Sequence, residues 1–360
     1  MSADLLSDSS RIDSRPCSNR YAAYNLFRAD EEIREIIQSV FNELAAAGSH
    51  EAICNALSCL SDFAGGDTFE SRNSRNIVCV LKHSGMEAII ASMGRFSQSS
   101  EVQIRALRAL WKFARHDESR AFIAEMSLTR ITSAMRMHFD SSDVQEFGCS
   151  TLLNLSSDSN LSKFVASLAL EDILVVIRTH FHNTRILETA LAILRNLALD
   201  QSNAKQIMNM GLCDVLARMR GSMSHSTCQV ICLGLIFNLS NHFENDRLIV
   251  LQGLDCLVAT MQYNIQVAAV QKEILACLLL LTFNVENKKA VANLGLLLIL
   301  KSMHLHILDC DVQSRGCAVL GNLLDFGEDS YEGSQVFQRL EDIFQTCVRS
   351  NLLDFFFSLV

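Results

Sequence analysis

One pattern of apolar and small positions recurs along this sequence at a nearly constant spacing. Residues 190–197 read ALAILRNL, and close copies occupy residues 148–155, 232–239 and 316–323. The asparagine before the last leucine is Asn154, Asn196, Asn238 or Asn322, so successive spacings are 42, 42 and 84 residues. A constant period between 20 and 50 residues is the signature of a repeat architecture.

Three further copies of the pattern lack the asparagine and carry another residue in its place. We call these places the ladder positions, and the chain has seven: Asp62, Lys112, Asn154, Asn196, Asn238, Leu280 and Asn322. The residues five and two before each ladder position and one after it are almost always apolar, as in Leu191, Leu194 and Leu197. These spacings place them on one face of a helix, which predicts a buried stripe. A small residue six before the ladder position predicts close approach of a neighbouring helix.

Each repeat from Asn73 onward is expected to contain three helices, of which the one bearing the ladder position is the last; the first repeat lacks the leading short helix. A glycine and an apolar residue separate the first two, as at Gly211, Gly253 and Gly295. Because glycine tolerates positive φ, we interpret this step as a sharp bend between helices. Ser127 and Ala169 fill the same place in two other repeats. Nine residues before five of the ladder positions stands a glutamine: Gln103, Gln145, Gln229, Gln271 and Gln313.

The two ends of the chain differ from the repeats. Residues 1–20 are rich in Ser, Asp and Arg and predict a disordered tail. Residues 21–326 form the predicted solenoid, with a first helix opening at Asp30–Glu32, a second from His50, and a surface loop at residues 65–73. Residues 327–360 predict capping helices or a truncated eighth repeat. Their final aromatic run, LLDFFFSLV, either covers the last repeat or forms an exposed apolar end for self-association.

Composition narrows the class of protein further. The 360 residues are 49% hydrophobic and 20% charged, with a single proline, Pro16, and a formal net charge of −9. An acidic chain is a poor general binder of nucleic acid, because phosphate contacts dominate that affinity. The thirteen cysteines, with no secretory signal, indicate reduced thiols in the cytoplasm or nucleus. The sequence contains no run of 18 apolar residues, so it does not predict a membrane-spanning helix.

The motif of the third helix, VQ at its start and LxNL at its end with a small residue between, resembles the armadillo repeat over residues 30–325. HEAT repeats are the nearest alternative, but their units usually have two helices and a turn bearing Pro and Arg. The resemblance implies an all-α fold, a right-handed alpha-alpha superhelix of about seven repeats. It also implies that the third helices line a concave groove that binds protein segments.

In this family the asparagine at the ladder position typically bonds to the main chain of an extended bound segment. The resemblance thus implies a peptide-binding ladder at Asn154, Asn196, Asn238 and Asn322, since an amide offers both a donor and an acceptor. The alternative is that each asparagine braces the next repeat of its own solenoid. Both roles are compatible, and the sequence leaves them open.

Adaptors of the importin-alpha type place tryptophan four residues before the ladder position. Here that place holds Ser58, Arg108, Ser150, Ala192, Gly234, Ala276 and Ala318, and the one tryptophan, Trp111, directly precedes a ladder position. We therefore exclude the conventional import-adaptor function. The small residues predict a shallow, open groove floor.

The third helix of one repeat, the helix that bears Lys112, carries a stripe of basic residues. Arg105, Arg108, Lys112 and Arg115 are spaced by 3, 4 and 3 residues, beside Trp111. The stripe is either a solvated charged face or, as in β-catenin-like grooves, a site for an acidic peptide.

No metal, cofactor or catalytic site is expected. Cys228 and Cys232, and Cys54 and Cys59, have helical spacing, but a zinc site needs convergent ligands, and we interpret them as buried apolar residues. Three histidines that share one repeat position, His138, His180 and His306, are expected to be structural. No phosphate-binding loop or nucleophile motif is present.

The sequence therefore predicts a non-catalytic scaffold or adaptor that binds extended protein segments, acidic ones included. A first alternative is a structural or regulatory subunit held through the convex face and the apolar C-terminal end. A second is a nucleocytoplasmic transport adaptor of a non-classical type. Expected partners are proteins, with no nucleic acid.

Overall fold

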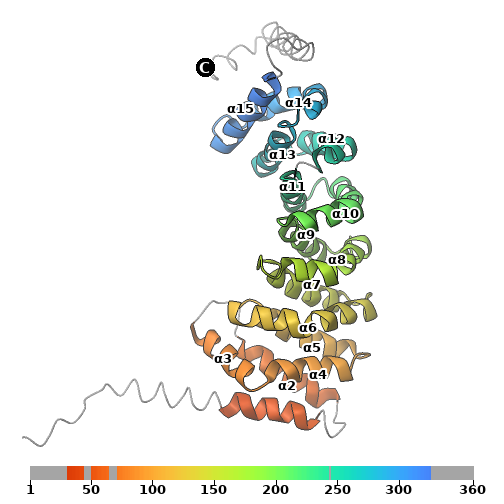
Figure 1. Cartoon of the computed structure of the whole chain (residues 1–360), viewed down its shortest axis with the longest axis vertical. Helices are drawn as coiled ribbons and strands as arrows, with labels where there is room; N and C mark the ends of the chain where they lie inside the picture. Colours follow the sequence, from red (N-terminus) through yellow and green to blue (C-terminus); the bar gives the residue numbers. More distant parts are fainter. Residues whose placement is uncertain (1–30, 44–49, 65–70, 243–244, 326–360) are drawn as a thin grey trace, which may run out of the picture.

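The computed structural model describes residues 31–43, 50–64, 71–242 and 245–325, which are helical and contain no strand. The helices stack in sequence order along one long axis, from the helix of residues 31–43 at one end to α15 at the other (Figure 1). This is the all-α, armadillo-type superhelical solenoid that the resemblance implies, and it repeats as the 42-residue period predicts. The predicted tail at 1–20 and the C-terminal segment 327–360 lie outside the described residues.

Every ladder position lies on a helix that we call a signature helix. These seven are α2 (His50–Phe63), α5 (Ser100–Phe113), α7 (Ser142–Ser156), α9 (Thr184–Leu197), α11 (Ser226–Ser240), α13 (Ala268–Leu281) and α15 (Cys310–Leu324). The others, which we call outer helices, are α3 (Ser71–Lys82), α4 (Gly85–Arg95), α6 (Asp117–Met137), α8 (Ser162–Thr179), α10 (Gln201–Gly221), α12 (Asp246–Tyr263) and α14 (Val285–Leu305). Residues 31–43 form one more helix before α2, as predicted.

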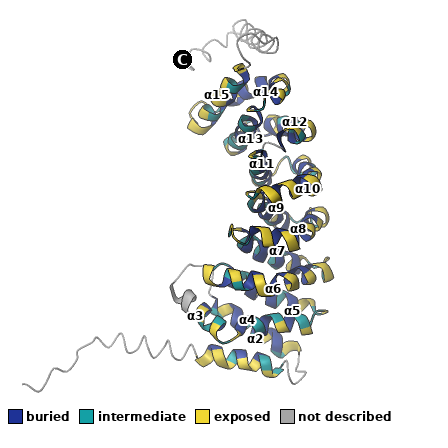
Figure 2. Cartoon of the chain, in the orientation of Figure 1, coloured by how far each residue is buried: buried dark blue, intermediate teal, exposed yellow. Residues whose placement is uncertain are grey.

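Successive signature helices pack against one another more extensively than successive outer helices do. The signature helices therefore form the tighter, concave side of the solenoid, and the outer helices form the wider, convex side. Figure 2 shows the buried residues concentrated between the two layers. The predicted stripe is confirmed, because Leu191, Leu194 and Leu197 are all fully buried.

The prediction of three helices in each repeat is wrong for most repeats. The first two helices are separate only as α3 and α4, where Ser84 adopts a left-handed conformation with φ 62° and the axes bend by 66°. Elsewhere one helix runs through the expected break, and Gly211 lies in the interior of α10. The predicted loop at 65–73 is also too long, since α3 begins at Ser71.

Two of the glycines of that step, Gly211 and Gly253, serve packing rather than a bend. A Cβ atom on Gly211 would lie 2.7 Å from Leu174 Cδ2 of the preceding outer helix, and one on Gly253 would lie 3.2 Å from Leu216 Cδ2. The expectation of positive φ is therefore wrong, and the physical reason for glycine is the close approach of the next outer helix. The small residue of the signature helix behaves as predicted, since a Cβ on Gly148 would meet Met135 at 2.8 Å.

The recurring glutamine closes the ends of five outer helices: α4, α6, α10, α12 and α14. Gln229 Nε2 donates to Met219 O and to Ser222 O, both at 2.8 Å. The same pair of bonds is made by Gln103, Gln145, Gln271 and Gln313. The last carbonyls of a helix have no partner within it, so this side chain satisfies them. Leu187 replaces glutamine in α9 and is buried.

The three histidines are structural, as expected, although a contact between repeats is the cause. His138, His180 and His306 each bond through Nε2 to a main-chain carbonyl of the preceding repeat, at Ser97, Phe139 and Ile265. Because a carbonyl only accepts, each Nε2 carries the proton.

No single described helix is long and apolar enough to span a bilayer. Only a bent pair, residues Asn76–Lys82 with Gly85–Arg95, meets the length and composition criteria together.

Candidate functional site

The concave surface brings the ladder positions into one row. Asn154 Nδ2 donates to Trp111 O at 3.2 Å, and Asn238 Nδ2 donates to Arg195 O at 2.8 Å. Asn322 repeats this contact with Leu279 O at 3.4 Å. In each case the acceptor is the residue just before the ladder position of the preceding repeat. The asparagines therefore brace neighbouring signature helices.

The brace leaves part of each amide for another partner. Asn196 bonds to Ser156 Oγ at 3.2 Å, again in the preceding repeat. Asn154, Asn196, Asn238 and Asn322 are all half-buried. A carboxamide has two N–H groups and one oxygen, so a single bracing bond does not exhaust it. A role in binding a peptide main chain stays a prediction.

Lys112 occupies the same place as these asparagines and makes the same kind of contact. Its ammonium donates to Ser61 O at 3.2 Å and lies 3.4 Å from Asp62 Oδ1 of the first signature helix. Only 10% of its side chain is exposed. Lys112 thus braces the first two repeats, and its ammonium group binds partners within the protein.

The rest of the basic stripe divides into bound and accessible residues. Arg105 lies 3.7 Å from Glu101 and 3.4 Å from Ser58 Oγ. Arg115 is half-buried and also has an interaction within the chain. Arg108 is exposed, and its guanidinium has no hydrogen bond or ion pair to the described residues. The structure therefore keeps Arg108 as the accessible cation of this helix.

A second accessible cation, Arg195, was missed by the sequence analysis. It directly precedes a ladder position on α9, is exposed, and likewise has no ionic partner among the described residues. Its side chain lies over the next repeat, because a Cβ on Gly234 would be 3.0 Å from Arg195 Cδ. The signal was available: the residue before each ladder position lies on the concave face, where Trp111 and Phe237 also stand.

The floor of the groove is less open than predicted. Trp111 is half-buried and contacts the ring of Phe147 in the next repeat, with centroids 5.8 Å apart. Leu153, Phe237 and Leu279 occupy the same register as Trp111 and are also half-buried. The groove is thus lined by these large side chains, each one residue before a ladder position. The residues four before the ladder position are mostly small and leave space for these large side chains.

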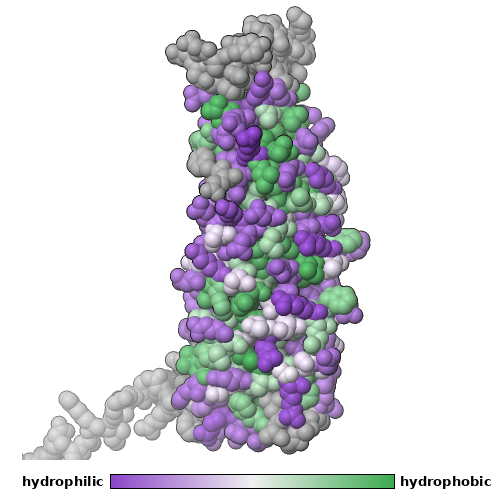
Figure 3. All heavy atoms as spheres, turned by 45° about the vertical axis from the view of Figure 1, so that its right-hand side comes forward, coloured by the Kyte–Doolittle hydropathy of each residue, from purple (hydrophilic) through white to green (hydrophobic). Residues whose placement is uncertain are grey.

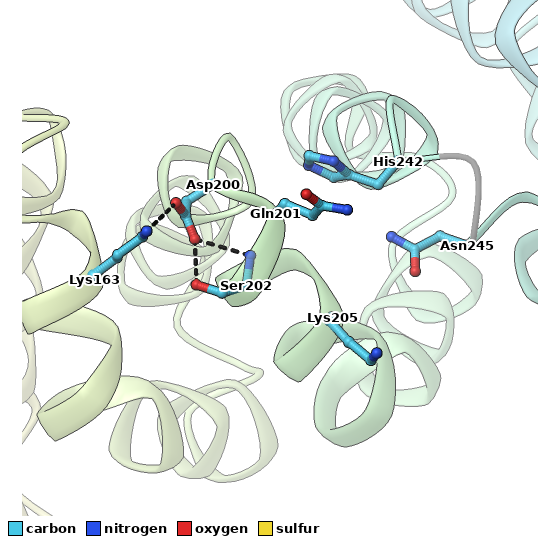
Figure 4. A pocket seen from close by; sticks show the side chains of 7 residues that line it. All are labelled: Lys163, Asp200, Gln201, Ser202, Lys205, His242 and Asn245. Atoms are coloured by element: carbon cyan, nitrogen blue, oxygen red, sulfur yellow. Dashed lines mark hydrogen bonds and ion pairs between the residues drawn. The ribbon is translucent and has the colours of Figure 1, made fainter.

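A depression of about 400 Å³ lies at one edge of the solenoid, where signature helices end and outer helices begin. Lys163, Lys205, His242, Asn245, Gln201, Ser202 and Asp200 line it (Figure 4). Asp200 caps α10, accepting from Ser202 N and Asn203 N, and lies 3.3 Å from Lys163. This ion pair and the capping bonds lower the pKa of Asp200, with the Ser202 hydroxyl contributing most. The depression is polar and of mixed charge.

Asp246 follows Asn245 and is 1% exposed, and its Oδ1 atom has no hydrogen-bond partner. Burial raises the pKa of this carboxyl to about 6. Since the unfolded value is about 3.9, the native state binds more protons between these values, and stability falls as pH rises through this window.

Asp246→Asn should therefore raise the free energy of unfolding at pH 7 by about 1–2 kcal/mol, and by much less at pH 4.5. Urea denaturation at both pH values measures this. Asp255→Asn, at an exposed site of the same helix, should change stability by less than about 0.5 kcal/mol. A gain that is equal at both pH values would mean that the charge of Asp246 is not the cause.

Comparison with known proteins agrees with this geometry. The profile of the LRRK2 ARM repeat family matches residues 89–296, which is more than half of the chain. The chain belongs to the armadillo repeat family. No curated protein matches this sequence.

Solved armadillo-type structures share the fold at low sequence identity. One is an engineered protein at 20% identity and TM-score 0.66, covering 81% of this chain and 68% of its own. Another comes from a study of a phosphorylation switch controlling the interaction between cadherin and beta-catenin, at 17% identity and TM-score 0.66. It covers 91% of this armadillo chain, which spans 62% of that one. A computationally designed armadillo repeat protein for modular peptide recognition has 14% identity and TM-score 0.53. The match covers 81% of this chain and 99% of the designed protein.

Proposed function

We propose that this armadillo protein is a non-catalytic scaffold or adaptor of the cytoplasm or nucleus whose concave groove binds an extended, acidic segment of a partner protein. This proposal rests on one observation: the chain has a net charge of −9, yet its concave side presents two accessible cations, Arg108 and Arg195. Arginines without internal partners are suited to carboxylates, which they bind through two parallel hydrogen bonds.

The position of the two arginines supports an extended ligand. Arg108 lies on α5 and Arg195 on α9, with α7 packed between them. Helices pack about 8–10 Å apart, so the two cations are separated by roughly 16–20 Å, which an extended chain of about five or six residues would cover. Half-buried Trp111, one turn after Arg108 on α5, and half-buried Leu153 on the intervening α7 offer apolar contacts. Similar structures are described as recognising peptides.

Fluorescence anisotropy with two synthetic peptides tests the proposal. One peptide alternates Glu with Leu, and the other has Lys in place of Glu. We expect the acidic peptide to bind more tightly, and the double variant Arg108→Glu/Arg195→Glu to weaken it at least about tenfold, with a smaller salt dependence.

The matched control reverses two exposed lysines of the outer helix α14, Lys289→Glu/Lys301→Glu, with the same change in net charge. It should stay within about twofold of the wild type, because these lysines lie far along the solenoid on its outer layer. Equal binding of both peptides, or equal loss in both variants, would reject the groove site.

A second function is favoured by one observation on the convex side. Apolar residues with 36–50% exposure recur at one register of the outer helices: Met126, Leu168, Met210 and Leu294. Figure 3 shows hydrophobic surface recurring along this side. Such a row suits a structural subunit held through its convex face. A partner bound there would be captured equally by wild type and by the Arg108→Glu/Arg195→Glu variant.

A further inference from the structure

Three side chains of different chemistry meet where the first two signature helices pack together. A ring nitrogen of His50, the sulfur of Cys54 and a carboxylate oxygen of Glu101 all lie within 4.8 Å of one another. No other three His, Cys, Asp or Glu side chains within residues 31–43, 50–64, 71–242 and 245–325 converge in this way.

The local structure explains why they converge. His50 and Cys54 are one helical turn apart at the start of α2, so they share a face. Glu101 lies in the first turn of α5, which packs against α2. The His50 ring lies edge-on to Phe96 at 6.1 Å and is hydrogen-bonded to Ser99. The imidazole is thus held at the junction of the two repeats.

The repeat pattern shows that stacking alone does not require these residues. The place of His50, twelve before the ladder position, holds small residues in all other copies: Ser100, Ser142, Thr184, Ser226, Ala268 and Cys310. The place of Cys54 holds no other cysteine: Ile104, Glu146, Glu188, Val230, Lys272 and Ser314. Both departures occur in the same copy, and their donor atoms face each other. A shared ligand accounts for the coincidence.

The cluster has a weak cationic partner in Arg105. Cys54 is 5% exposed, so its sulfur is shielded from water. The Glu101 carboxylate lies 3.7 Å from the Arg105 guanidinium, and both side chains are well exposed. Exposed ion pairs of this kind contribute little and exchange readily.

We propose that His50, Cys54 and Glu101 bind one Zn²⁺ ion. The set of one nitrogen, one sulfur and one oxygen donor is of the kind zinc takes, at about 2.0–2.3 Å from each donor. In a tetrahedral site these lengths place donors about 3.3–3.8 Å apart, so the exposed His50 and Glu101 side chains close in by about 1 Å. On binding, the S–H bond of Cys54 breaks, the S–Zn bond forms, and the proton passes to solvent.

Three protein ligands leave the fourth coordination position for water or an external group. Because His50 and Cys54 belong to α2 and Glu101 to α5, the ion fastens the first repeat to the second. Zinc therefore stabilises the packing of the first signature helix against the second.

Metal titration of the full-length protein, after chelation and dialysis, tests the site. Co²⁺ is added first, because a cobalt–thiolate bond gives a charge-transfer absorption, and Zn²⁺ then competes. We expect one equivalent to bind with this absorption and to raise the thermal midpoint. Cys54→Ala should abolish the absorption and the rise, and His50→Ala should weaken affinity at least about tenfold.

Cys59→Ala is the matched control, since Cys59 is exposed on the same helix and lies outside the cluster. It should retain absorption, affinity and stabilisation. Circular dichroism checks folding, and the exposed His50 provides a variant that does not disturb the core. An absorption that persists in Cys54→Ala, or its absence in the wild type, would overturn the assignment.

Discussion

Gln229→Glu is expected to lower the free energy of unfolding by about 3–5 kcal/mol at pH 7. The substitution exchanges one nitrogen for oxygen and leaves the size of the side chain unchanged. Gln229 is fully buried, and its amide nitrogen donates to Met219 O and Ser222 O at 2.8 Å. A carboxylate there would have no proton to donate and would place a negative charge against two carbonyl oxygens.

Urea denaturation against pH measures the effect and its cause. The loss should shrink toward pH 4.5, because a protonated carboxyl regains one donor. Gln313→Glu should cost less, since Gln313 makes the same two bonds but is half-buried, so water can reach the charge. Gln206→Glu, at an exposed site on α10, controls for the change in net charge. A loss independent of both pH and burial would refute this account of the repeating glutamine.

The regular features of the fold were predictable because they repeat. The period of 42 residues and the stripe of Leu191, Leu194 and Leu197 follow from a requirement that every copy shares, the burial of an apolar face against its neighbours. The continuity of α10 through Gly211 was not predictable in this way. Glycine suits both a left-handed bend and a crowded helix contact, and only the position of Leu174 decides between them.

The groove was predictable as a surface but not residue by residue. Spacing places Lys112 and Arg108 on one face, yet the first is buried against Ser61 and the second is exposed. Whether a charge is accessible depends on the partner that the neighbouring repeat offers, which spacing within one helix does not contain. Arg195 was missed for the complementary reason, since the other arginine of α9, Arg185, lies ten residues earlier and the two form no stripe.

The same limit applies to the cysteines. Spacing within one helix pairs Cys54 with Cys59, whereas the structure brings Cys54 to Glu101 of the next repeat. The prediction that Cys59 is buried is wrong, because its side chain is exposed on α2, whereas Cys228 and Cys232 are buried as predicted. Contacts within a helix are thus predictable from sequence, and contacts between repeats need the geometry of stacking.

Alanine at Gly211, Gly253 and Gly295 should give a graded series of stabilities. All three glycines occupy one register of the outer helices, and alanine alone should stabilise each helix by up to about 1 kcal/mol. The space differs: a new Cβ would lie 2.7 Å from Leu174 Cδ2, 3.2 Å from Leu216 Cδ2, and 3.9 Å from its nearest neighbours at Gly295. Leu174 is 1% exposed and has little room to move.

We therefore expect Gly295→Ala to stabilise by about 0.5–1 kcal/mol, Gly253→Ala to be nearly neutral, and Gly211→Ala to destabilise by about 1–2 kcal/mol, because overpacking outweighs propensity. Thermal and urea unfolding of the three single variants test the order. Adding Leu174→Ala to Gly211→Ala should cost less than Leu174→Ala costs in the wild type, since the new methyl group enters the space that leucine vacates. If all three alanines stabilise equally, the close approach of the outer helices does not explain glycine at this register. In that case the repeat keeps glycine at this register without a packing requirement. Ser127 and Ala169, which fill the same place in two other repeats, already show that a Cβ atom is tolerated there.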